Sequence, residues 1–561
     1  MPEERVDAVI VGSGFGGSVV AQRLAEEGLG VLVLERGKPY PPGAFPRRPR
    51  EMRNNFWDPS EGLHGMFDVW SFRNLEAVVA SGLGGGSLIY ANVLIRKDER
   101  WFVHDGPPGR GHEHWPVTRA DLDPHYDRVE PMLGGRPYPL GDAPYDGTPK
   151  TLAMREAAER LGIEWRLPAL AVSFAGPGEQ PGVPVLEPEG NLHGRPRYTC
   201  RLCGECDVGC NYGSKNTLDF NYLSAAARRG AEIRTRCEVR GFAPDGGGYV
   251  VRYVEHDPAR EGRKTNTGRL PERIVRTDRL VLSAGTLGTT YLLLRNRAAF
   301  PGIGPALGTR FCGNGDLLAG LVDARLPDGR PRFIDASRGP VITSAMRMGD
   351  ALDGDGSTGR GFYLEDGGYP GFVDWMLEAT DAPGQFRRLV SFAVDRAWAY
   401  VTGSPKSNLS ARLQSLFGSG RLSGSSLPML AMGRDVPDGR MTLRRRYLDV
   451  DWSLGSSERY FERVRATMSD VAEALGGELG DLLLYLGRVI TVHALGGCPM
   501  GRDAREGVVD AHGAVFNHPG LYVADGSVMP GPVGPNPSLT IAALADRTAD
   551  RIIADHRGTA G

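Results

Sequence analysis

The sequence predicts an α/β fold (α+β overall) that opens with a β-α-β unit. An apolar strand pattern enters the turn Gly12-x-Gly14-x-x-Gly17, a helix pattern follows, and a second apolar run ends in Glu35. Strand, glycine turn, helix, strand and acid in this order form the dinucleotide-binding fingerprint. The N-terminal region is therefore predicted to be a Rossmann-type domain.

Each residue of this fingerprint has a separate physical role. Gly12 makes the tight turn, Gly14 lets the backbone approach a pyrophosphate, and Gly17 lets helix and strand pack closely. The first N–H groups of the helix have no intrahelical partner, so they are free to bind phosphate. Glu35 stands where an acid accepts the ribose hydroxyls, which disfavours a 2′-phosphate and hence NADP.

Further elements of the same type occur in the middle of the chain and at its end, so the Rossmann-type domain is predicted to be discontinuous. The strand-like pieces between them are broken by turns and predict a second, mainly antiparallel sheet. The predicted division assigns residues 1–315 and 486–561 to the nucleotide domain, with wrapping loops at 38–75 and 100–199, and 316–485 to a substrate domain.

The remaining elements are predicted from periodicity and turn residues. A second glycine loop covers 78–95, and an apolar run over 279–283 leads into another glycine turn and a helix. Paired strands are expected over Glu232–Arg240 and Tyr249–Glu255. Helices are expected over Thr151–Leu161, Thr217–Arg229, 384–404 and Leu539–Asp555.

Composition excludes several classes of protein. The chain has 561 residues, a formal net charge of −2 and 24% charged residues, so it has no bulk attraction to nucleic acid. No apolar run is long enough to span a membrane. The N-terminal sequence has no apolar signal region and no twin arginine. We therefore expect a cytoplasmic protein that does not bind nucleic acid.

Four of the seven cysteines are clustered with the spacing Cys200-x-x-Cys203-x-x-Cys206-x-x-x-Cys210. This spacing is typical of a ferredoxin iron–sulfur motif, although Asn211 stands where that motif has proline. Zinc sites more often have two separated pairs. The sequence predicts a [3Fe–4S] or [4Fe–4S] cluster held by these cysteines, with zinc or purely structural or redox cysteines as the alternatives.

The C-terminal part resembles the glucose-methanol-choline (GMC) flavin oxidoreductases, and within them the bacterial cholesterol oxidase branch. The resemblance rests on His493-Ala-Leu-Gly496-Gly497-Cys498, Leu521-Tyr-Val-Ala-Asp525-Gly526-Ser527 and Gly534-Pro-Asn536-Pro537. It implies a bound FAD and a flavin domain beside a sheet-based substrate domain.

The resemblance also implies roles for individual residues. Gly12, Gly14, Gly17 and Glu35 would hold the ADP half of FAD, and the Val239 backbone would meet the adenine. The loop from Gly84 to Asn92 would lie against the isoalloxazine, although Tyr90 replaces the asparagine that sterol oxidases have there. Gly84, Gly85, Ser87, Asn92, Asp525, Gly526, Asn536 and Pro537 complete the implied FAD site.

The family's catalytic pair falls on His493 and Asn536. A histidine titrates near working pH and suits a general base for the alcohol proton. An asparagine both donates and accepts, so it can hold the substrate oxygen as charge develops. Glu365 is a candidate second base, because sterol oxidases use a glutamate on their substrate sheet; an ordinary turn acid is the alternative.

The predicted substrate is a bulky apolar alcohol of the sterol or terpenoid class. The substrate region is rich in aromatic and apolar side chains that fit either such a pocket or a plain core: Phe362, Tyr363, Tyr369, Phe372, Trp375, Met376, Phe386, Phe392 and Trp398. Residues 387–417 mix basic and apolar side chains, compatible with a solvated lid or with peripheral contact to a membrane or partner.

The predicted activity is FAD-dependent oxidation of this alcohol, with hydride transfer to flavin N5. An iron–sulfur cluster would pass the electrons to an acceptor protein and make the enzyme a dehydrogenase; without one, O₂ would suffice. The alternatives are a lyase or photodecarboxylase on the same fold, a sugar or polyol dehydrogenase with a partner electron carrier, and an electron-transfer subunit.

Overall fold

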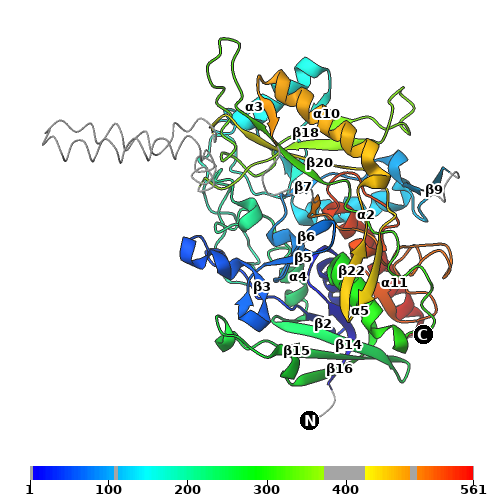
Figure 1. The fold of residues 1–561 in the computed structure, drawn as a ribbon. Coiled ribbons are helices and arrows are strands. Elements are labelled where there is room, and N and C mark those ends of the chain that lie inside the picture. The colour runs from blue at the N-terminus through cyan, green and yellow to red at the C-terminus, as the bar shows by residue number, and fades with distance from the viewer. Residues whose placement is uncertain (1–3, 106–110, 372–423, 481–488, 560–561) are drawn as a thin grey trace, which may run out of the picture.

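The computed structural model describes residues 4–105, 111–371, 424–480 and 489–559, and two large sheets organise it (Figure 1). The first sheet has seven strands and lies at the end of the molecule that carries the N-terminus. Its order is β13 (Glu232–Arg234), β2 (Val31–Leu34), β1 (Glu4–Val11), β16 (Glu272–Leu282), β15 (Gly248–Glu255) and β14 (Cys237–Asp245), with β25 (Leu521–Val523) also pairing with β16.

The first sheet joins stretches from both ends of the chain. Strands β13, β2, β1, β16 and β25 run parallel to their neighbours, whereas β15 and β14 form an antiparallel extension. Strand β2 is buried along its whole length and β1 over its second half, as expected for strands covered on both faces. Helices α1 (Phe15–Glu26), α4 (Tyr222–Arg228), α5 (Gly285–Asn296) and α11 (Ser538–Thr559) accompany this sheet, and α1 packs on both α4 and α11.

The second sheet lies at the opposite end and is antiparallel at every pairing. Helix α10 (Glu458–Ala474) packs on it and on α3 (Pro149–Leu161), burying apolar residues from all three in one cluster. The strand order is β11 (Glu164–Arg166), β18 (Ala345–Met348), β19 (Phe362–Asp366), β20 (Leu427–Gly433), β17 (Leu317–Val322) and β23 (Glu478–Gly480).

Smaller elements fill the space between and around the two sheets. Helix α2 (Arg119–Leu133) begins at a capping box in which Thr118 and Asp121 satisfy each other's backbone N–H groups, and it packs on α11. The small sheets are β10–β12–β7 (Arg136–Pro137, Ala169–Leu170, Val93–Leu94), β24–β6–β5 (Val489–Thr491, Leu75–Ala80, Phe67–Ser71), β21–β22 (Arg440–Arg444, Tyr447–Asp451), β3–β4 (Trp57–Asp58, Leu63–His64) and β8–β9 (Val103–Asp105, His112–His114).

Three predicted elements differ from the structure. The stretch expected as one strand over Glu232–Arg240 divides into β13 and β14, because Arg236 takes a positive φ of 60° between them. The helix expected from Thr217 begins only at Tyr222, where the Asn221 side chain caps it. Strand β11 lies within a predicted wrapping loop yet pairs with β18 of the second sheet.

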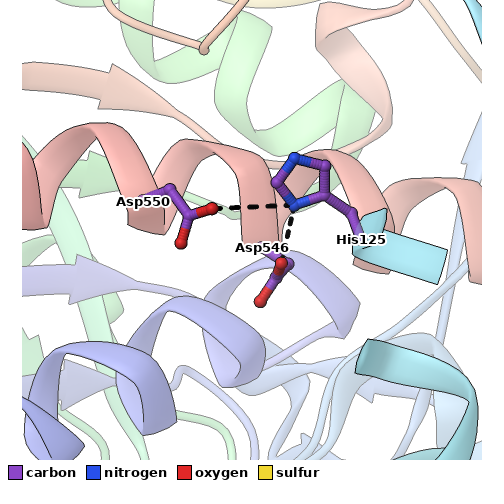
Figure 2. A group of neighbouring side chains, drawn as sticks. All are labelled: His125, Asp546 and Asp550. Atoms are coloured by element: carbon purple, nitrogen blue, oxygen red, sulfur yellow. Dashed lines mark hydrogen bonds and ion pairs between the residues drawn. The ribbon is translucent and has the colours of Figure 1, made fainter. Parts of the chain in front are cut away.

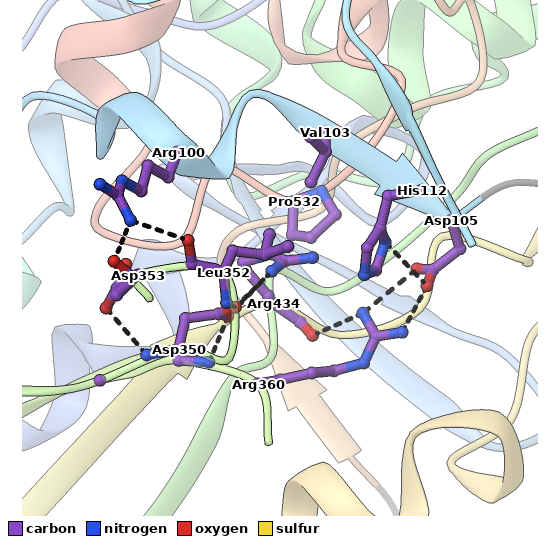
Figure 3. Close-up of polar contacts among 12 residues, drawn as sticks. Arg100, Val103, Asp105, His112, Asp350, Leu352, Asp353, Arg360, Arg434 and Pro532 are labelled. Atoms are coloured by element: carbon purple, nitrogen blue, oxygen red, sulfur yellow. Dashed lines mark hydrogen bonds and ion pairs between the residues drawn. The ribbon is translucent and has the colours of Figure 1, made fainter. Parts of the chain in front are cut away.

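An ion-pair network connects the second sheet to the β8–β9 hairpin (Figure 3). Arg434 Nη1 lies 2.9 and 2.8 Å from the two carboxylate oxygens of Asp350, and both side chains are buried. Arg360 pairs with Asp105 of β8 and donates to the Arg434 carbonyl oxygen at 3.2 Å. Because every carboxylate here faces a guanidinium, we interpret this network as structural.

Candidate active site

The glycines of the first turn are required by close backbone approaches. Gly12 has a φ of 99°, and a Cβ there would lie 2.3 Å from the Ser283 carbonyl oxygen. A Cβ at Gly17 would lie 2.1 Å from the Gly12 carbonyl oxygen. Both contacts are far shorter than van der Waals distance, so only glycine allows α1 to leave β1 at this angle.

The two glycine loops lie against each other. Gly85 has a φ of 53°, and a Cβ there would lie 2.6 Å from the Gly14 Cα. The Ser13 hydroxyl accepts from the Gly84 N–H at 3.0 Å, which fixes the second loop on the first. The structure thus forms one continuous backbone surface from two loops about seventy residues apart in sequence.

Glu35 is buried beside this surface, 5% exposed. Its Oε2 accepts from the N–H and the hydroxyl of Ser13 at 3.1 and 2.7 Å, and its Oε1 accepts from the Gly37 N–H at 2.7 Å. A carboxylate has about four acceptor positions, so one remains for a further donor such as a ribose hydroxyl. Val239 lies nearby on β14, after Cys237, whose N–H donates to the Glu35 carbonyl oxygen at 2.8 Å.

Asp525 and Gly526 connect the first sheet to the His493 loop. The Asp525 carboxylate accepts from the Ser527 N–H and hydroxyl and from the Thr289 hydroxyl, while burial raises its pKa. The Gly526 carbonyl oxygen accepts from the Gly496 N–H at 3.1 Å. These contacts bring Asp525 and Gly526, which the resemblance assigns to the FAD site, next to the loop that carries the candidate base.

Asn92 indicates where a polar group from outside the chain is needed. It is fully buried with a φ of 72°, and neither its side-chain oxygen nor its nitrogen has a hydrogen-bond partner. Leaving a buried amide unpaired costs on the order of 1–3 kcal/mol per group. Ser87, in the same loop, is instead satisfied by the Gly84 carbonyl oxygen and the Leu218 N–H. The orphaned amide fits a loop that lies against a polar cofactor.

His493 is held by an aspartate that the sequence analysis did not identify. Its Nδ1 lies 2.8 Å from Asp316 Oδ1, and the Asp316 side chain is only 1% exposed. Asp316 Oδ2 accepts from the Thr491 hydroxyl and from the Val492 N–H, both at 2.9 Å. Because Nδ1 must carry the proton to donate to Asp316, Nε2 of the neutral ring is left as an acceptor.

Asn536 and Glu365 form the second polar pair. Asn536 Nδ2 donates to Glu365 Oε2 at 3.3 Å, and Glu365 Oε1 and Asn536 Oδ1 are buried without partners. Burial raises the pKa of Glu365 to about 8, and the charges of Asp366 and Asp316 add to this shift. Glu365 is therefore mostly protonated at neutral pH and offers an O–H donor as well as an acceptor.

The immediate cross-strand neighbours of Glu365 on β19 are apolar, whereas Arg166 and Arg347 lie further along the same face. These neighbours are Ala345 on β18 and Leu430 on β20, and Leu430 remains partly exposed. Phe362 and Tyr363 are packed in buried clusters, and Tyr369 is 9% exposed. The other predicted pocket residues, from Phe372 to Trp398, and the predicted lid at 387–417 lie outside the described residues.

The four clustered cysteines line one small cavity near the second glycine loop. The Leu202 N–H donates to Cys200 Sγ at 3.4 Å, and the Ser214 N–H donates to Cys210 Sγ at 3.3 Å. Burial raises the pKa of Cys200, Cys203 and Cys206, to about 12 for Cys203. A redox-reactive cysteine has a lowered pKa, so these buried groups do not fit that alternative.

The cysteine sulfurs are too dispersed for one zinc ion. Two ligands of one zinc lie at most about 4.6 Å apart, twice a Zn–S bond of about 2.3 Å. Within the described residues, the only group of three or more possible ligands within 4.8 Å of one another is His125, Asp546 and Asp550.

The group of His125, Asp546 and Asp550 joins α2 to α11 (Figure 2). His125 Nδ1 lies 2.7 Å from Asp546 Oδ2 and 4.0 Å from Asp550 Oδ2. Arg23 and Arg128 each pair with both aspartates. Two guanidiniums therefore supply the positive charge that a metal ion would supply, and we interpret this group as an ion-pair network.

A polar cavity of about 460 Å³ lies apart from the predicted site. Its lining includes His104, Arg310, Arg440 and Glu506 and none of the predicted catalytic or cofactor residues. In the described part of the chain no helix has the length and apolarity that a membrane span requires.

Comparison with known proteins identifies the family of the chain. Two family models match it, both described as GMC oxidoreductase, over residues 6–309 and 438–545. The chain is 31% identical to a cholesterol oxidase from Mycobacterium tuberculosis, with 97% of this chain and 90% of the relative covered. It is 28% identical to a cholesterol oxidase from Acinetobacter baumannii, with 98% and 95% covered.

A solved structure has the same fold. Pyridoxine 4-oxidase from Mesorbium loti matches with a TM-score of 0.55 and 18% identity, covering 97% of this chain and 99% of that chain. The predicted α/β fold with a Rossmann-type FAD-binding domain is thereby confirmed. The protein is an FAD-binding enzyme that acts on alcohols, and the chain belongs to the GMC oxidoreductase family.

Proposed function

We propose that this enzyme oxidises the hydroxyl of a bulky apolar alcohol, of the sterol or terpenoid class, to a carbonyl. The observation that carries the proposal is the His493–Asp316 pair, which turns Nδ1 toward the carboxylate and leaves Nε2 as the proton-accepting nitrogen beside the loops assigned to the flavin. FAD, when bound, supplies the acceptor for the hydride that leaves the carbon.

The proton of the alcohol goes to His493. With Nδ1–H directed at Asp316, the lone pair of Nε2 accepts the hydroxyl proton as the C–H bond is broken. The imidazolium that results is stabilised by the Asp316 carboxylate, which has no lysine or arginine partner among the described residues. The alcohol loses one proton and one hydride, so protons and electrons balance.

Asn536 and Glu365 hold the substrate oxygen. Below about pH 8 Glu365 is protonated, and its O–H together with the Asn536 amide can stabilise developing negative charge on that oxygen. In this range Glu365 acts as a hydrogen-bond donor, and only at higher pH does it become the second base proposed from the sequence.

Two observations support an apolar substrate. The Glu365 carboxyl lies on a strand face whose neighbours are Ala345 and Leu430, and no ion pair of Glu365 occurs in the described ranges. A sugar or polyol presents many hydroxyls that such a face would leave unpaired, at a cost of about 1–3 kcal/mol each. Relatives named cholesterol oxidases support the same class.

Anaerobic addition of a panel of alcohols tests the activity directly. We expect a sterol or terpenoid alcohol to bleach the flavin absorbance, and short polyols to leave it unchanged. A panel of sugars that bleaches the flavin faster than every apolar alcohol would support a sugar dehydrogenase instead. Bleaching by none of them, with light-dependent loss of a fatty acid carboxyl, would support the decarboxylase alternative.

We also propose that Cys200, Cys203, Cys206 and Cys210 hold an iron–sulfur cluster that passes electrons to an acceptor protein. Such a cluster has one cysteine on each of several irons, so it does not require the sulfurs to gather around one ion. The N–H groups of Leu202 and Ser214 donate to two of the sulfurs, as expected for thiolate ligands.

Lys215 lies between the cysteines and the second glycine loop, and burial lowers its pKa while the nearby Cys206 and Asp207 raise it. It is 1% exposed, and its Nζ donates to the carbonyl oxygens of Leu88, Tyr90 and Cys206 at 3.1, 2.8 and 2.8 Å. A buried ammonium favours a nearby negative charge, such as a thiolate-bound cluster.

Anaerobic purification with iron, sulfide and zinc analysis tests the cluster. We expect several irons per chain and absorbance beyond that of flavin, both lost in Cys206→Ser and kept in Cys237→Ser, a buried cysteine outside the cluster. Flavin absorbance alone, without iron, would overturn the cluster and leave an enzyme that needs only O₂.

A further inference from the structure

The segment between the two large sheets, residues 312–316, contacts both catalytic loops. Cys312 forms an antiparallel bridge with Leu495, two residues after His493, through N–H···O bonds of 3.1 and 3.0 Å. Asn314 and Asp316 follow, and β17 begins at Leu317. Their side chains reach different loops.

Asp316 fixes the His493 loop at three points. Besides His493 Nδ1, it accepts from the Thr491 hydroxyl and the Val492 N–H, and the Thr491 hydroxyl in turn accepts from the His493 N–H at 3.0 Å. The ring and the backbone that carries it are therefore set by one buried carboxylate.

Asn314 fixes the Asn536 loop at four points. Its Nδ2 donates to the carbonyl oxygens of Gly534 and Pro535, both at 3.2 Å. Its Oδ1 accepts from the N–H groups of Val533 and Gly534 at 2.9 and 3.0 Å. Asn314 is fully buried, and every hydrogen bond of its side chain goes to the three residues that precede Asn536.

The backbone of residues 313–315 is fixed by its own turn geometry and by two neighbouring side chains. Asn314 and Gly315 have φ angles of 55° and 69°, a left-handed turn that asparagine and glycine tolerate. A Cβ at Gly315 would lie 2.3 Å from the Tyr460 hydroxyl oxygen, which donates to the Gly315 carbonyl oxygen at 2.9 Å. Asp435 accepts from the Gly313 N–H at 2.9 Å.

We propose that Asn314 and Asp316 are positioning residues that form one brace and set the distance between His493 and Asn536. The inference rests on the proposed function, because it assigns the brace to that catalytic pair. The two loops lie 43 residues apart in sequence, and both are hydrogen-bonded to this one segment. A displacement of about 1 Å between reacting groups can cost about 10²-fold in rate.

Asp316→Asn tests the contact between the brace and the His493 loop. The amide has the size of the carboxylate but brings N–H donors toward groups that themselves donate, so the His493 ring loses its fixed tautomer. We expect anaerobic flavin reduction by the alcohol to slow at least about 10²-fold, with FAD content retained and the dependence on pH changed. Asp316→Glu, which keeps the charge on a longer arm, should recover part of the rate.

Asn314→Gly tests the contact between the brace and the Asn536 loop. Glycine keeps the left-handed backbone and removes all four side-chain hydrogen bonds. We expect flavin reduction to slow about ten-fold or more, and the double variant with Asn536→Ala should be no slower than Asn536→Ala alone.

Double variants separate positioning from general damage. Asp316→Asn combined with His493→Ala should be no slower than His493→Ala alone, because the brace acts through the ring. Asp546→Asn, in the other buried histidine–aspartate pair, is the matched control and should change the rate by the same factor with or without His493. If the double variant is slower than His493→Ala by the full factor that Asp316→Asn causes alone, the two residues act independently. That result would refute the positioning role of Asp316 and leave the proposed function intact. An unchanged rate in His493→Ala would overturn both.

Discussion

Two histidine–aspartate pairs in this enzyme have nearly the same geometry and different surroundings. His493 Nδ1 lies 2.8 Å from Asp316, and His125 Nδ1 lies 2.7 Å from Asp546 (Figure 2). All four side chains are mostly buried, with at most 15% exposed. Distance and burial therefore do not distinguish them.

The charges around each aspartate do distinguish them. Burial alone would raise the pKa of Asp546, but His125, Arg128 and Arg23 together lower it. Arg128 Nη2 also lies 2.8 Å from His125 Nδ1, so the same nitrogen has a carboxylate and a guanidinium beside it. Asp316 instead receives hydrogen bonds only from His493, Thr491 and Val492 among the described residues.

The difference in surrounding charge indicates which histidine–aspartate pair is suited to proton transfer. A carboxylate already neutralised by two arginines gains little from a protonated ring beside it, whereas an otherwise unneutralised carboxylate stabilises that ring strongly. The pair proposed for proton transfer is the one whose carboxylate has no lysine or arginine partner in the described part of the chain.

The largest expected effect contrasts the two histidines. His493→Ala should slow anaerobic flavin reduction by about 10²–10⁴-fold while FAD stays bound, because the proposed general base is lost. His125→Ala should leave this rate within about two-fold, since the ion-pair network of His125 includes none of the proposed catalytic or cofactor residues. Stopped-flow absorbance of both variants measures the contrast, and equal slowing in both would refute the distinction drawn here.

Much of the flavin-binding framework was predictable from the sequence, because its signals are local. The turn around Gly12 and the loop around Gly85 each need glycine for a close backbone approach, and such needs are visible in a short stretch. The terminal helix was likewise visible in its periodicity, and the structure places it at Ser538–Thr559.

The parts that escaped prediction depend on contacts between distant residues. Asp316 is 177 positions from His493, and Asn314 is 220 positions from Gly534. Both lie in a glycine-rich turn, where Asn and Asp are common for purely local reasons. The sequence therefore offered no signal that their side chains reach the catalytic loops.

The next largest expected effect is on stability and results from a change in the His125–Asp546 pair. Asp546→Asn leaves Arg23 and Arg128 partly buried with reduced compensation, so we expect the free energy of unfolding to fall by about 3 kcal/mol. Because the pKa of Asp546 is lowered in the folded state, its stabilisation is present above the unfolded pKa and lost as pH falls. Thermal unfolding from pH 3 to 7 should show a shallower acid limb in the variant than in the wild type.

The smallest expected effect on rate comes from a change at Glu365. Its pKa is raised in the folded state, whereas that of Asp546 is lowered. The Glu365 pKa of about 8 in the folded state exceeds the ordinary pKa of 4.5 for a glutamate, so between these values the folded state holds a proton that the unfolded state has released. The stability this contributes is complete below pH 4.5 and is lost as pH rises toward about 8.

Glu365→Gln removes this titration while keeping a hydrogen-bond donor near Asn536. We expect flavin reduction at pH 7 to change by less than about ten-fold, because the amide N–H replaces the protonated carboxyl as donor. Each pKa unit corresponds to about 1.4 kcal/mol, so the variant should lose less stability than the wild type between pH 5 and 8, by an amount on the order of a few kcal/mol. Melting temperatures of both proteins across this range measure the difference. Parallel curves would mean that Glu365 is ionised at neutral pH and that the oxygen-binding pair carries a negative charge.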